Sequence, residues 1–204
     1  MSVPKHVIRV RGIGICCIPK CANTSIKAAV LQSMGYDPEA LLRGGALHRH
    51  PALNLGTRNE VGALYVAAFV RHPVARLVSA WADKIARHDG RATDTLVKLG
   101  FRVGMPFAEF AWLACQNAGR DVHIRPQVDF VARHVNLLGR VETLDRDWRR
   151  LRDRCPWLPA LGRWQATGAD WRDCCDEQTA ALICGAYEED WTLWRQAGDR
   201  GGDD

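Results

Sequence analysis

The chain has 204 residues, of which 47% are apolar, and its 28 Lys and Arg residues against 23 Asp and Glu residues give a formal net charge of +5. This composition excludes a disordered tail, a coiled coil and a collagen-like fibre. A chain of this length folds by default as one domain, residues 1–204, and needs neither a metal nor a disulfide to hold its core. Because 23 of the basic residues are Arg and only five are Lys, the composition favours anionic partners such as a nucleotide, an anionic polymer or a nucleic acid.

The cysteines indicate the redox environment. None of the eight is spaced as CxxC, so the sequence predicts neither a zinc ribbon nor a thioredoxin-type dithiol. The sequence contains no run of about 18 apolar residues and no pattern typical of a secretory signal. We therefore expect a cytoplasmic protein with reduced and mostly buried thiols.

The first predicted elements are a strand, a tight turn and a helix. Residues 6–18 (HVIRVRGIGICCI) alternate and then become nearly continuously apolar, which is typical of a central parallel strand covered on both faces. Pro19 ends this strand. Residues 24–34 have the apolar spacing of a helix, with Asn23 or Thr24 as its N-cap.

The same pattern recurs along the chain. Residues 64–70 (LYVAAFV) predict a second buried strand, and residues 74–86 predict an amphipathic helix. Residues 135–141 (VNLLGRV) predict a third strand, followed by a charged helix over residues 142–154. Another helix is expected over residues 106–116, and the tail over residues 173–194 is expected to be helical. Strands that alternate with helices indicate an α/β fold with a parallel sheet and ligands at the carboxyl ends of the strands.

The first turn carries residues suited to an anion. Between a buried strand and a helix, backbone N–H groups and the helix dipole point toward one place. In PKCANTS (residues 19–25), Lys20 supplies a positive charge, and Thr24 and Ser25 offer hydroxyl groups. The turn lacks the GxxxxGK[ST] pattern, which disfavours a kinase or ATPase. A solvated lysine in an ordinary turn is the alternative for Lys20.

The second turn lies in FVRHPVARLVSAWADK (residues 69–84). Arg71 leaves a buried strand, and Ser79 lies on the helix that follows. A phosphate near the start of this helix can receive both the guanidinium fork and the hydroxyl group. The alternative is a surface arginine and an ordinary helical serine.

Together these two segments resemble the paired signatures of sulfotransferases that use 3′-phosphoadenosine-5′-phosphosulfate (PAPS). A third segment, residues 121–148, is similar to the HxxPQ…GxxExLxxD stretch of the membrane-bound carbohydrate sulfotransferases and their bacterial relatives. The resemblance extends from about residue 7 to residue 190. It implies a P-loop-like, three-layer α/β fold with a central parallel sheet flanked by helices. It also implies sulfuryl transfer from PAPS, without a metal, to a hydroxyl acceptor, for which we expect a carbohydrate.

The resemblance assigns roles to individual residues. Lys20 matches the lysine that contacts the bridging oxygen and the leaving phosphate. Thr24 and Ser25 match the hydroxyl groups on the 5′-phosphate, and Arg71 and Ser79 match the pair on the 3′-phosphate. The donor-binding candidates are Pro19, Lys20, Cys21, Ala22, Asn23, Thr24, Ser25, Arg71 and Ser79. The sequence departs from the family at Ala22 and Asn23, where many members have glycine, and this departure leaves the loop geometry open.

A hydroxyl acceptor also needs a base, and histidine titrates in the right range. His48 and His50 lie in LHRHP, between the two donor motifs. The heparan sulfate 2-O-sulfotransferases have a similar HxH whose second histidine is catalytic, so the resemblance favours His50 as the base, with His48 beside it. His123, in the HxxPQ-like element, is the alternative.

Two other functions stay open at this point. The same anion sites would serve a non-catalytic protein that binds a nucleotide or a nucleic acid, and a P-loop nucleotide kinase is the second alternative. Under the favoured reading we expect no nucleic-acid partner and no membrane segment. Six of the eight tryptophans fall between Trp148 and Trp194, where core packing is favoured over a platform for sugars.

Overall fold

The computed structural model describes residues 6–86, 92–162, 164 and 170–199. The chain divides into two compact units, each with its own hydrophobic core. Unit 1 consists of Met1–Val70, Phe130–Ala166 and Ala197–Asp204, and unit 2 consists of Arg71–Asp129 and Thr167–Gln196. A single domain over residues 1–204 stays a prediction.

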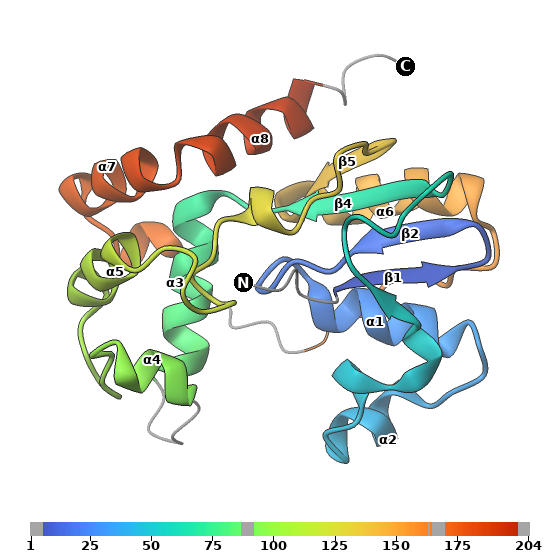
Figure 1. The fold of residues 1–204 in the computed structure, drawn as a ribbon, viewed down its shortest axis with the longest axis horizontal. Coiled ribbons are helices and arrows are strands. Elements are labelled where there is room, and N and C mark those ends of the chain that lie inside the picture. Colours follow the sequence, from blue (N-terminus) through green and yellow to red (C-terminus); the bar gives the residue numbers. More distant parts are fainter. Residues whose placement is uncertain (1–5, 87–91, 163, 165–169, 200–204) are drawn as a thin grey trace. The chain divides into compact units, whose positions relative to one another are not determined.

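Unit 1 is built on a five-stranded sheet with the strand order β3-β1-β2-β4-β5 (Figure 1). The strands are β1 (Val7–Val10), β2 (Ile13–Cys16), β3 (Leu55–Gly56), β4 (Tyr65–Val70) and β5 (Leu137–Arg140). β2, β4 and β5 are parallel, whereas β1 is antiparallel to both β2 and β3. The α/β class and the strands expected at residues 64–70 and 135–141 are confirmed. The expectation of a parallel sheet is wrong, because the sheet is mixed.

The difference arises at Arg11 and Gly12. Their φ angles are 45° and 83°, and two positive φ values in succession are the mark of a two-residue type I′ hairpin turn. Val10 pairs with Ile13 across this turn, so the single strand predicted over residues 6–18 is a β-hairpin. The sequence conceals the turn because Arg9 and Arg11 continue the alternation expected of one uninterrupted strand.

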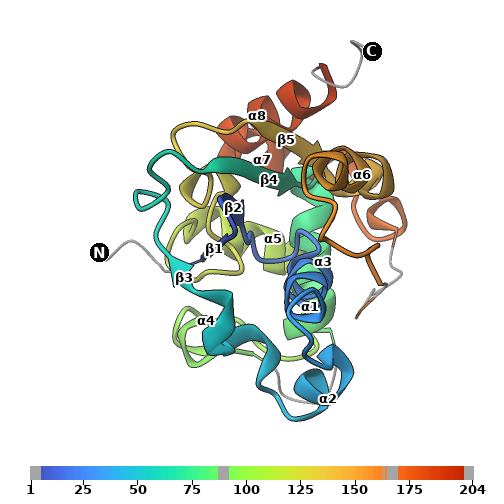
Figure 2. The same ribbon diagram turned by 90° about the vertical axis from the view of Figure 1, so that its right-hand side faces the viewer.

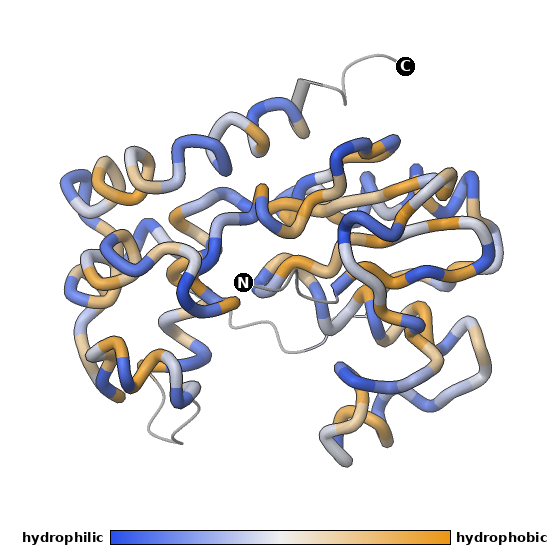
Figure 3. Tube along the Cα trace, viewed as in Figure 1, coloured by the Kyte–Doolittle hydropathy of each residue, from blue (hydrophilic) through white to orange (hydrophobic). Residues whose placement is uncertain are grey.

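Two helices of unit 1 cover the same face of the sheet. α1 (Asn23–Gln32) and α6 (Leu144–Arg154) contribute Ile26 and Trp148 to one core, which also contains Ile15 of β2 and Phe69 of β4. Both helices lie to the right of the strands in Figure 2, and hydrophobic residues run along β2 and β4 in Figure 3. A shorter helix, α2 (Pro38–Arg43), follows α1. The P-loop-like, three-layer arrangement stays a prediction.

Unit 2 is helical in its described part. Its helices are α3 (Pro73–Lys84), α4 (Asp94–Lys98), α5 (Phe107–Gln116), α7 (Glu177–Ala186) and most of α8 (Glu188–Asp199). The helices predicted over residues 74–86 and 106–116 are confirmed. The helical structure predicted over residues 173–194 is confirmed for most of this stretch, and it is divided into α7 and α8 at Tyr187, which leaves helical geometry with φ −119° and ψ 39°.

All eight cysteines lie in the described residues and are free thiols, and four of them are buried. Burial raises the pKa of Cys16 to about 11 and that of Cys17 to about 12. No described helix has both the length and the apolar character needed to cross a membrane.

Candidate active site

The first candidate loop runs from the end of β2 to the start of α1. Lys20 and Ala22 have φ angles of 69° and 55°, a left-handed conformation that residues with a Cβ rarely adopt. Conformations of this kind persist only where the surrounding structure imposes them, and they gather at ligand-binding and catalytic loops. Ala22, where many family members have glycine, therefore holds a left-handed conformation that glycine would adopt without strain.

The first turn of α1 has no side-chain cap. The helix begins at Asn23, and its N-cap residue is Ala22, so the prediction of Asn23 or Thr24 as the N-cap is wrong. Ala22 has no side-chain oxygen to accept a hydrogen bond, and such an uncapped helix N-terminus is suited to an anion. The Asn23 Oδ1 atom is buried and has no hydrogen-bond partner among the described residues. The side chain of Ser25 is buried.

Lys27 ties α1 to the histidine segment, residues 47–53. Its side chain is 6% exposed, and its Nζ donates a hydrogen bond of 3.1 Å to the carbonyl oxygen of His48. A buried ammonium group needs such an acceptor, because its desolvation is costly. Unit 1 therefore links the helix that begins at the Lys20 loop directly to the predicted catalytic histidines. Lys27 was not singled out from the sequence. Its place directly after Ile26, on the apolar face of the predicted helix, was the available sign that this lysine is buried.

His50 lies between two 3₁₀ turns, η1 (Leu47–Arg49) and η2 (Pro51–Leu53). Its Nδ1 accepts a hydrogen bond of 3.3 Å from the backbone N–H of Ala52, and its ring meets the ring of Tyr36 edge to face at 4.4 Å between centroids. A ring nitrogen that accepts a hydrogen bond carries no proton, so the neutral ring holds its proton on Nε2. In this conformation His50 accepts a proton only at Nδ1, after the bond to Ala52 opens.

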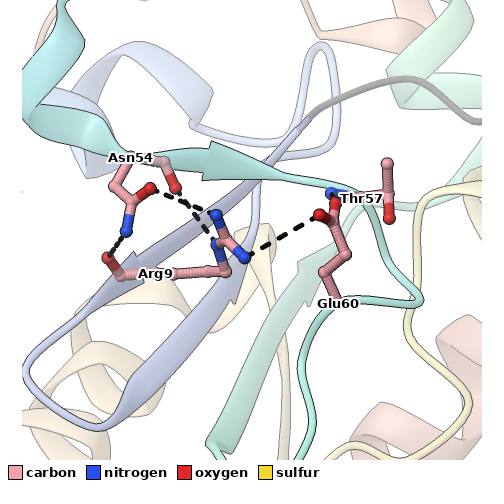
Figure 4. Close-up of polar contacts among 4 residues, drawn as sticks. All are labelled: Arg9, Asn54, Thr57 and Glu60. Carbon is pink, nitrogen blue, oxygen red and sulfur yellow. Dashed lines mark hydrogen bonds and ion pairs between the residues drawn. The ribbon is translucent and has the colours of Figure 1, made fainter.

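The other end of the histidine segment is held by β1. Arg9 Nη2 donates to Asn54 Oδ1 at 3.2 Å, and Asn54 Nδ2 donates to the Arg9 carbonyl at 3.3 Å (Figure 4). Arg9 also pairs with Glu60 at 3.9 Å, and Glu60 accepts a hydrogen bond of 2.6 Å from the Thr57 N–H. Gly56 makes room for this arginine, because a Cβ there would lie 2.8 Å from Arg9 Nε. The segment that carries the two histidines is thus fixed at both ends.

The second candidate turn belongs to unit 2. Arg71 follows β4 directly, and its backbone N–H and carbonyl are both paired with the side-chain amide of Gln127 at 2.9 Å. Ser79 lies in the buried part of α3. His72, the N-cap residue of α3, offers no side-chain cap. Its ring is surrounded by those of three tryptophans, with centroid distances between 4.7 and 5.0 Å: Trp171, Trp191 and Trp194.

Two buried ionisable residues of unit 2 interact electrostatically. Arg76 of α3 is 1% exposed and Asp190 of α8 is 0% exposed. Burial raises the pKa of Asp190, while Arg76 and hydrogen bonds from Gln127 and Val128 act in the opposite direction. Asp190 Oδ1 accepts a hydrogen bond of 3.0 Å from the Val128 N–H. Sequence reasoning did not predict this pair, because the two residues are more than a hundred positions apart.

His123 also belongs to unit 2. Its backbone N–H donates to Asp121 Oδ1 at 2.8 Å, and Asp121 Oδ2 accepts a hydrogen bond of 2.8 Å from the hydroxyl group of Thr93. Lys20, His48 and His50 all belong to unit 1. Unit 2 carries His123 with Arg71 and Ser79. Within the described ranges, no three His, Cys, Asp or Glu side chains are grouped to hold a metal ion.

The arrangement in unit 1 combines a lysine, an uncapped helix N-terminus and anchored histidines. Such a set can bind a phosphate or sulfate group and move a proton. A model of the sulfotransferase family matches residues 7–160, which include all of these residues and those of the second turn. Searches of curated proteins and of solved structures found no match. The match covers well over half of the chain, which therefore belongs to the sulfotransferase family.

Proposed function

We propose that this sulfotransferase uses PAPS as its donor and a hydroxyl group, most simply that of a carbohydrate, as its acceptor. The observation that carries the proposal is the Lys20 loop with the uncapped N-terminus of α1, within the segment that matches the family. Sulfotransferases generally use PAPS, and the uncapped helix start supports an anionic donor. The carbohydrate rests on the similarity of residues 121–148 to carbohydrate sulfotransferases.

The proposed reaction is an in-line displacement at sulfur. The acceptor oxygen forms a bond to sulfur as the bond between sulfur and the bridging oxygen breaks. The products are the sulfated acceptor and 3′-phosphoadenosine-5′-phosphate (PAP). Lys20 stabilises the negative charge that develops on the leaving 5′-phosphate, with Thr24 and Ser25 as further donors to it. Arg71 and Ser79 bind the 3′-phosphate. Catalysis then depends on positioning and on charge stabilisation, as in phosphoryl transfer.

The acceptor loses a proton in this reaction, and the proposed base is His50. Its Nδ1 takes the proton when the hydrogen bond of 3.3 Å to Ala52 opens, which costs little because that bond is long. His48 stands next to it in the segment anchored by Lys27. His123 is the second candidate, and the two are separated by the variants described in the Discussion.

Ligand-dependent stability tests the donor. We expect PAP to raise the melting temperature more than AMP or ATP does, since a ligand at 100 times its Kd stabilises a protein by about 2.7 kcal/mol. Lys20→Ala should keep the fold and lower turnover by about two to three orders of magnitude, the usual effect of removing one group that stabilises developing charge. Lys98→Ala, at an exposed lysine of α4, is the matched control and should leave turnover unchanged.

Other outcomes would support the alternatives. Equal stabilisation by ATP and PAP would favour a nucleotide kinase. Affinity for a nucleic acid that falls steeply with salt and is not competed by PAP would favour a non-catalytic binding protein. Near-normal turnover of Lys20→Ala would contradict the role of this lysine.

A further inference from the structure

Gln127 forms an unusual pair with the backbone of Arg71. Its Oε1 accepts a hydrogen bond from the Arg71 N–H, and its Nε2 donates one to the Arg71 carbonyl, both at 2.9 Å. The two residues are 56 positions apart, and the side chain of Gln127 is fully buried. One primary amide thus satisfies both backbone groups of Arg71, as a neighbouring strand does for a residue inside a sheet.

Arg71 needs such a partner because of its place in the chain. It comes directly after Val70, the last residue of β4, and two residues before Pro73, the first residue of α3. Neither strand nor helix pairing extends to its backbone, and a buried backbone group without a partner is costly. The double hydrogen bond from Gln127 fixes the backbone from which the Arg71 guanidinium extends.

A primary amide serves both bonds without any change in protonation, whereas an ionised carboxylate or an apolar chain does not. A carboxylate in the same place accepts from the N–H but places a second acceptor against the carbonyl oxygen, and an apolar chain serves neither group. Position 127 is therefore sensitive even to substitutions by side chains of nearly the same size as glutamine.

The turn that carries Gln127 is itself held by the buried side chain of Asp190. Gln127 opens the 3₁₀ turn η3 (Gln127–Asp129), in which the Val128 N–H donates to Asp190 Oδ1 at 3.0 Å. Asp190 interacts with Arg76, which lies on α3. The contacts therefore run from Arg71 to Gln127, on to Asp190, and back to the helix that begins just after Arg71. Every side chain in this path beyond Arg71 is at most 1% exposed.

We propose that Gln127 is a positioning residue that holds the backbone of Arg71 so that its guanidinium meets the 3′-phosphate of the donor. This inference rests on the function proposed above. It assigns to Gln127 no contact with the reacting atoms and predicts that its effect is confined to ligands that carry the 3′-phosphate.

The test compares two nucleotides that differ only in this phosphate, PAP and AMP, by titration calorimetry. Wild type should bind PAP more tightly than AMP. Gln127→Glu and Gln127→Met should each lower the preference for PAP by about tenfold or more, since a charged hydrogen-bonding contact is misaligned. Their affinity for AMP should stay within about twofold of wild type, because no other phosphate contact depends on this residue.

Two controls separate positioning from general destabilisation. Tyr187→Phe removes the buried hydrogen bond of 2.6 Å to the Ile124 carbonyl in the same unit, so it should lower stability and leave the preference for PAP unchanged. In an Arg71→Ala background the preference should already be lost, and adding Gln127→Glu should not lower it further. This non-additivity is expected only if Gln127 acts through Arg71.

The outcomes distinguish the two proposals. A wild type without preference for PAP overturns the function proposed above. A wild type that prefers PAP, together with Gln127 variants that keep this preference or lose PAP and AMP binding equally, overturns the role of Gln127 alone. If neither variant folds by circular dichroism, Gln127 is required for unit 2 as a whole, and the confined role is overturned.

Discussion

Asp147 shows what one buried carboxylate contributes to unit 1. Its Oδ2 accepts hydrogen bonds from the Arg140 N–H at 2.9 Å and from the Thr143 hydroxyl at 2.7 Å, and its Oδ1 accepts one from Arg146 Nε at 3.0 Å. Burial works to raise the pKa of Asp147, but these hydrogen bonds and the Arg146 charge together lower it below its ordinary value. The carboxylate thus joins the end of β5 to the first turn of α6.

This pKa sets the sign of a pH dependence. A carboxyl group whose pKa is lower in the folded state stabilises fully above its unfolded pKa of about 4 and loses this contribution as the pH falls through the folded pKa. Asp147→Asn should therefore cost about 1–3 kcal/mol at pH 7, and its deficit relative to wild type should shrink below about pH 4. Urea unfolding between pH 7 and pH 3 measures both effects. Asp145→Asn, at an exposed position of the same helix, should show neither, and a deficit that does not change with pH would contradict the assignment.

Residue identity alone pointed to the charged groups of the proposed site but not to the partners of those groups in the structure. Lys20 and Arg71 stand out in the sequence because each follows a buried strand. Gln127 and Lys27 do not, because their importance comes from backbone atoms 56 and 21 positions away. A hydrogen bond from a side chain to a distant carbonyl leaves no periodic trace in a sequence.

At the scale of elements, the strands and helices with strong patterns were predicted well. The apolar run of β4 and the amphipathic spacing of α3 each fit one periodicity, and both elements were confirmed. The β1–β2 hairpin was not predicted, because its two-residue turn at Arg11 and Gly12 preserves the alternation on both sides. The break at Tyr187 was missed because no glycine or proline marks it. Its ring is buried and its hydroxyl donates to the Ile124 carbonyl.

The histidine segment, residues 47–53, carries the proposed base, and replacing that base tests the role of the segment. His50→Ala should abolish turnover while leaving PAP binding unchanged, because the ring is proposed to act on the acceptor and not on the donor. His123→Ala, in the other unit, should leave turnover largely intact. Initial rates measure the turnover of both variants, and PAP titrations measure their affinity for the donor product. If His123→Ala alone silences the enzyme, the proposed base is wrong.

A second variant tests whether the anchoring of this segment matters. Lys27→Met removes the bond of 3.1 Å to the His48 carbonyl but retains an apolar chain of similar length. It should lower the turnover by less than His50→Ala does and keep the dependence of turnover on pH, since the base remains. A Lys27→Met enzyme with wild-type turnover would show that the anchoring does not contribute to catalysis.

At the scale of the whole molecule, the positive charge indicated a class of partner, and the cysteines indicated a redox state. The excess of arginine indicated an anionic partner, and the two turns and the family match narrowed this partner to the donor proposed above. Composition and periodicity could not predict the mixed sheet or the two compact units. The pairing of strands depends on contacts between residues far apart in the chain. Cysteine spacing, in contrast, led to the expectation of reduced thiols, which stays a prediction; the eight cysteines are free in this structure.

This state of the thiols gives the last prediction. Cys16, Cys17, Cys21 and Cys155 are buried, and burial raises the pKa of Cys115 and of Cys175 to about 11. Because the thiolate is the reactive form, iodoacetamide at pH 8 should label the native chain slowly and incompletely. After denaturation without a reductant, mass spectrometry should find eight alkyl groups, and fewer would reveal a disulfide. Labelling of all eight at once in the native protein would contradict the packing of unit 1, because the four buried thiols lie in that unit and are reached only when it opens.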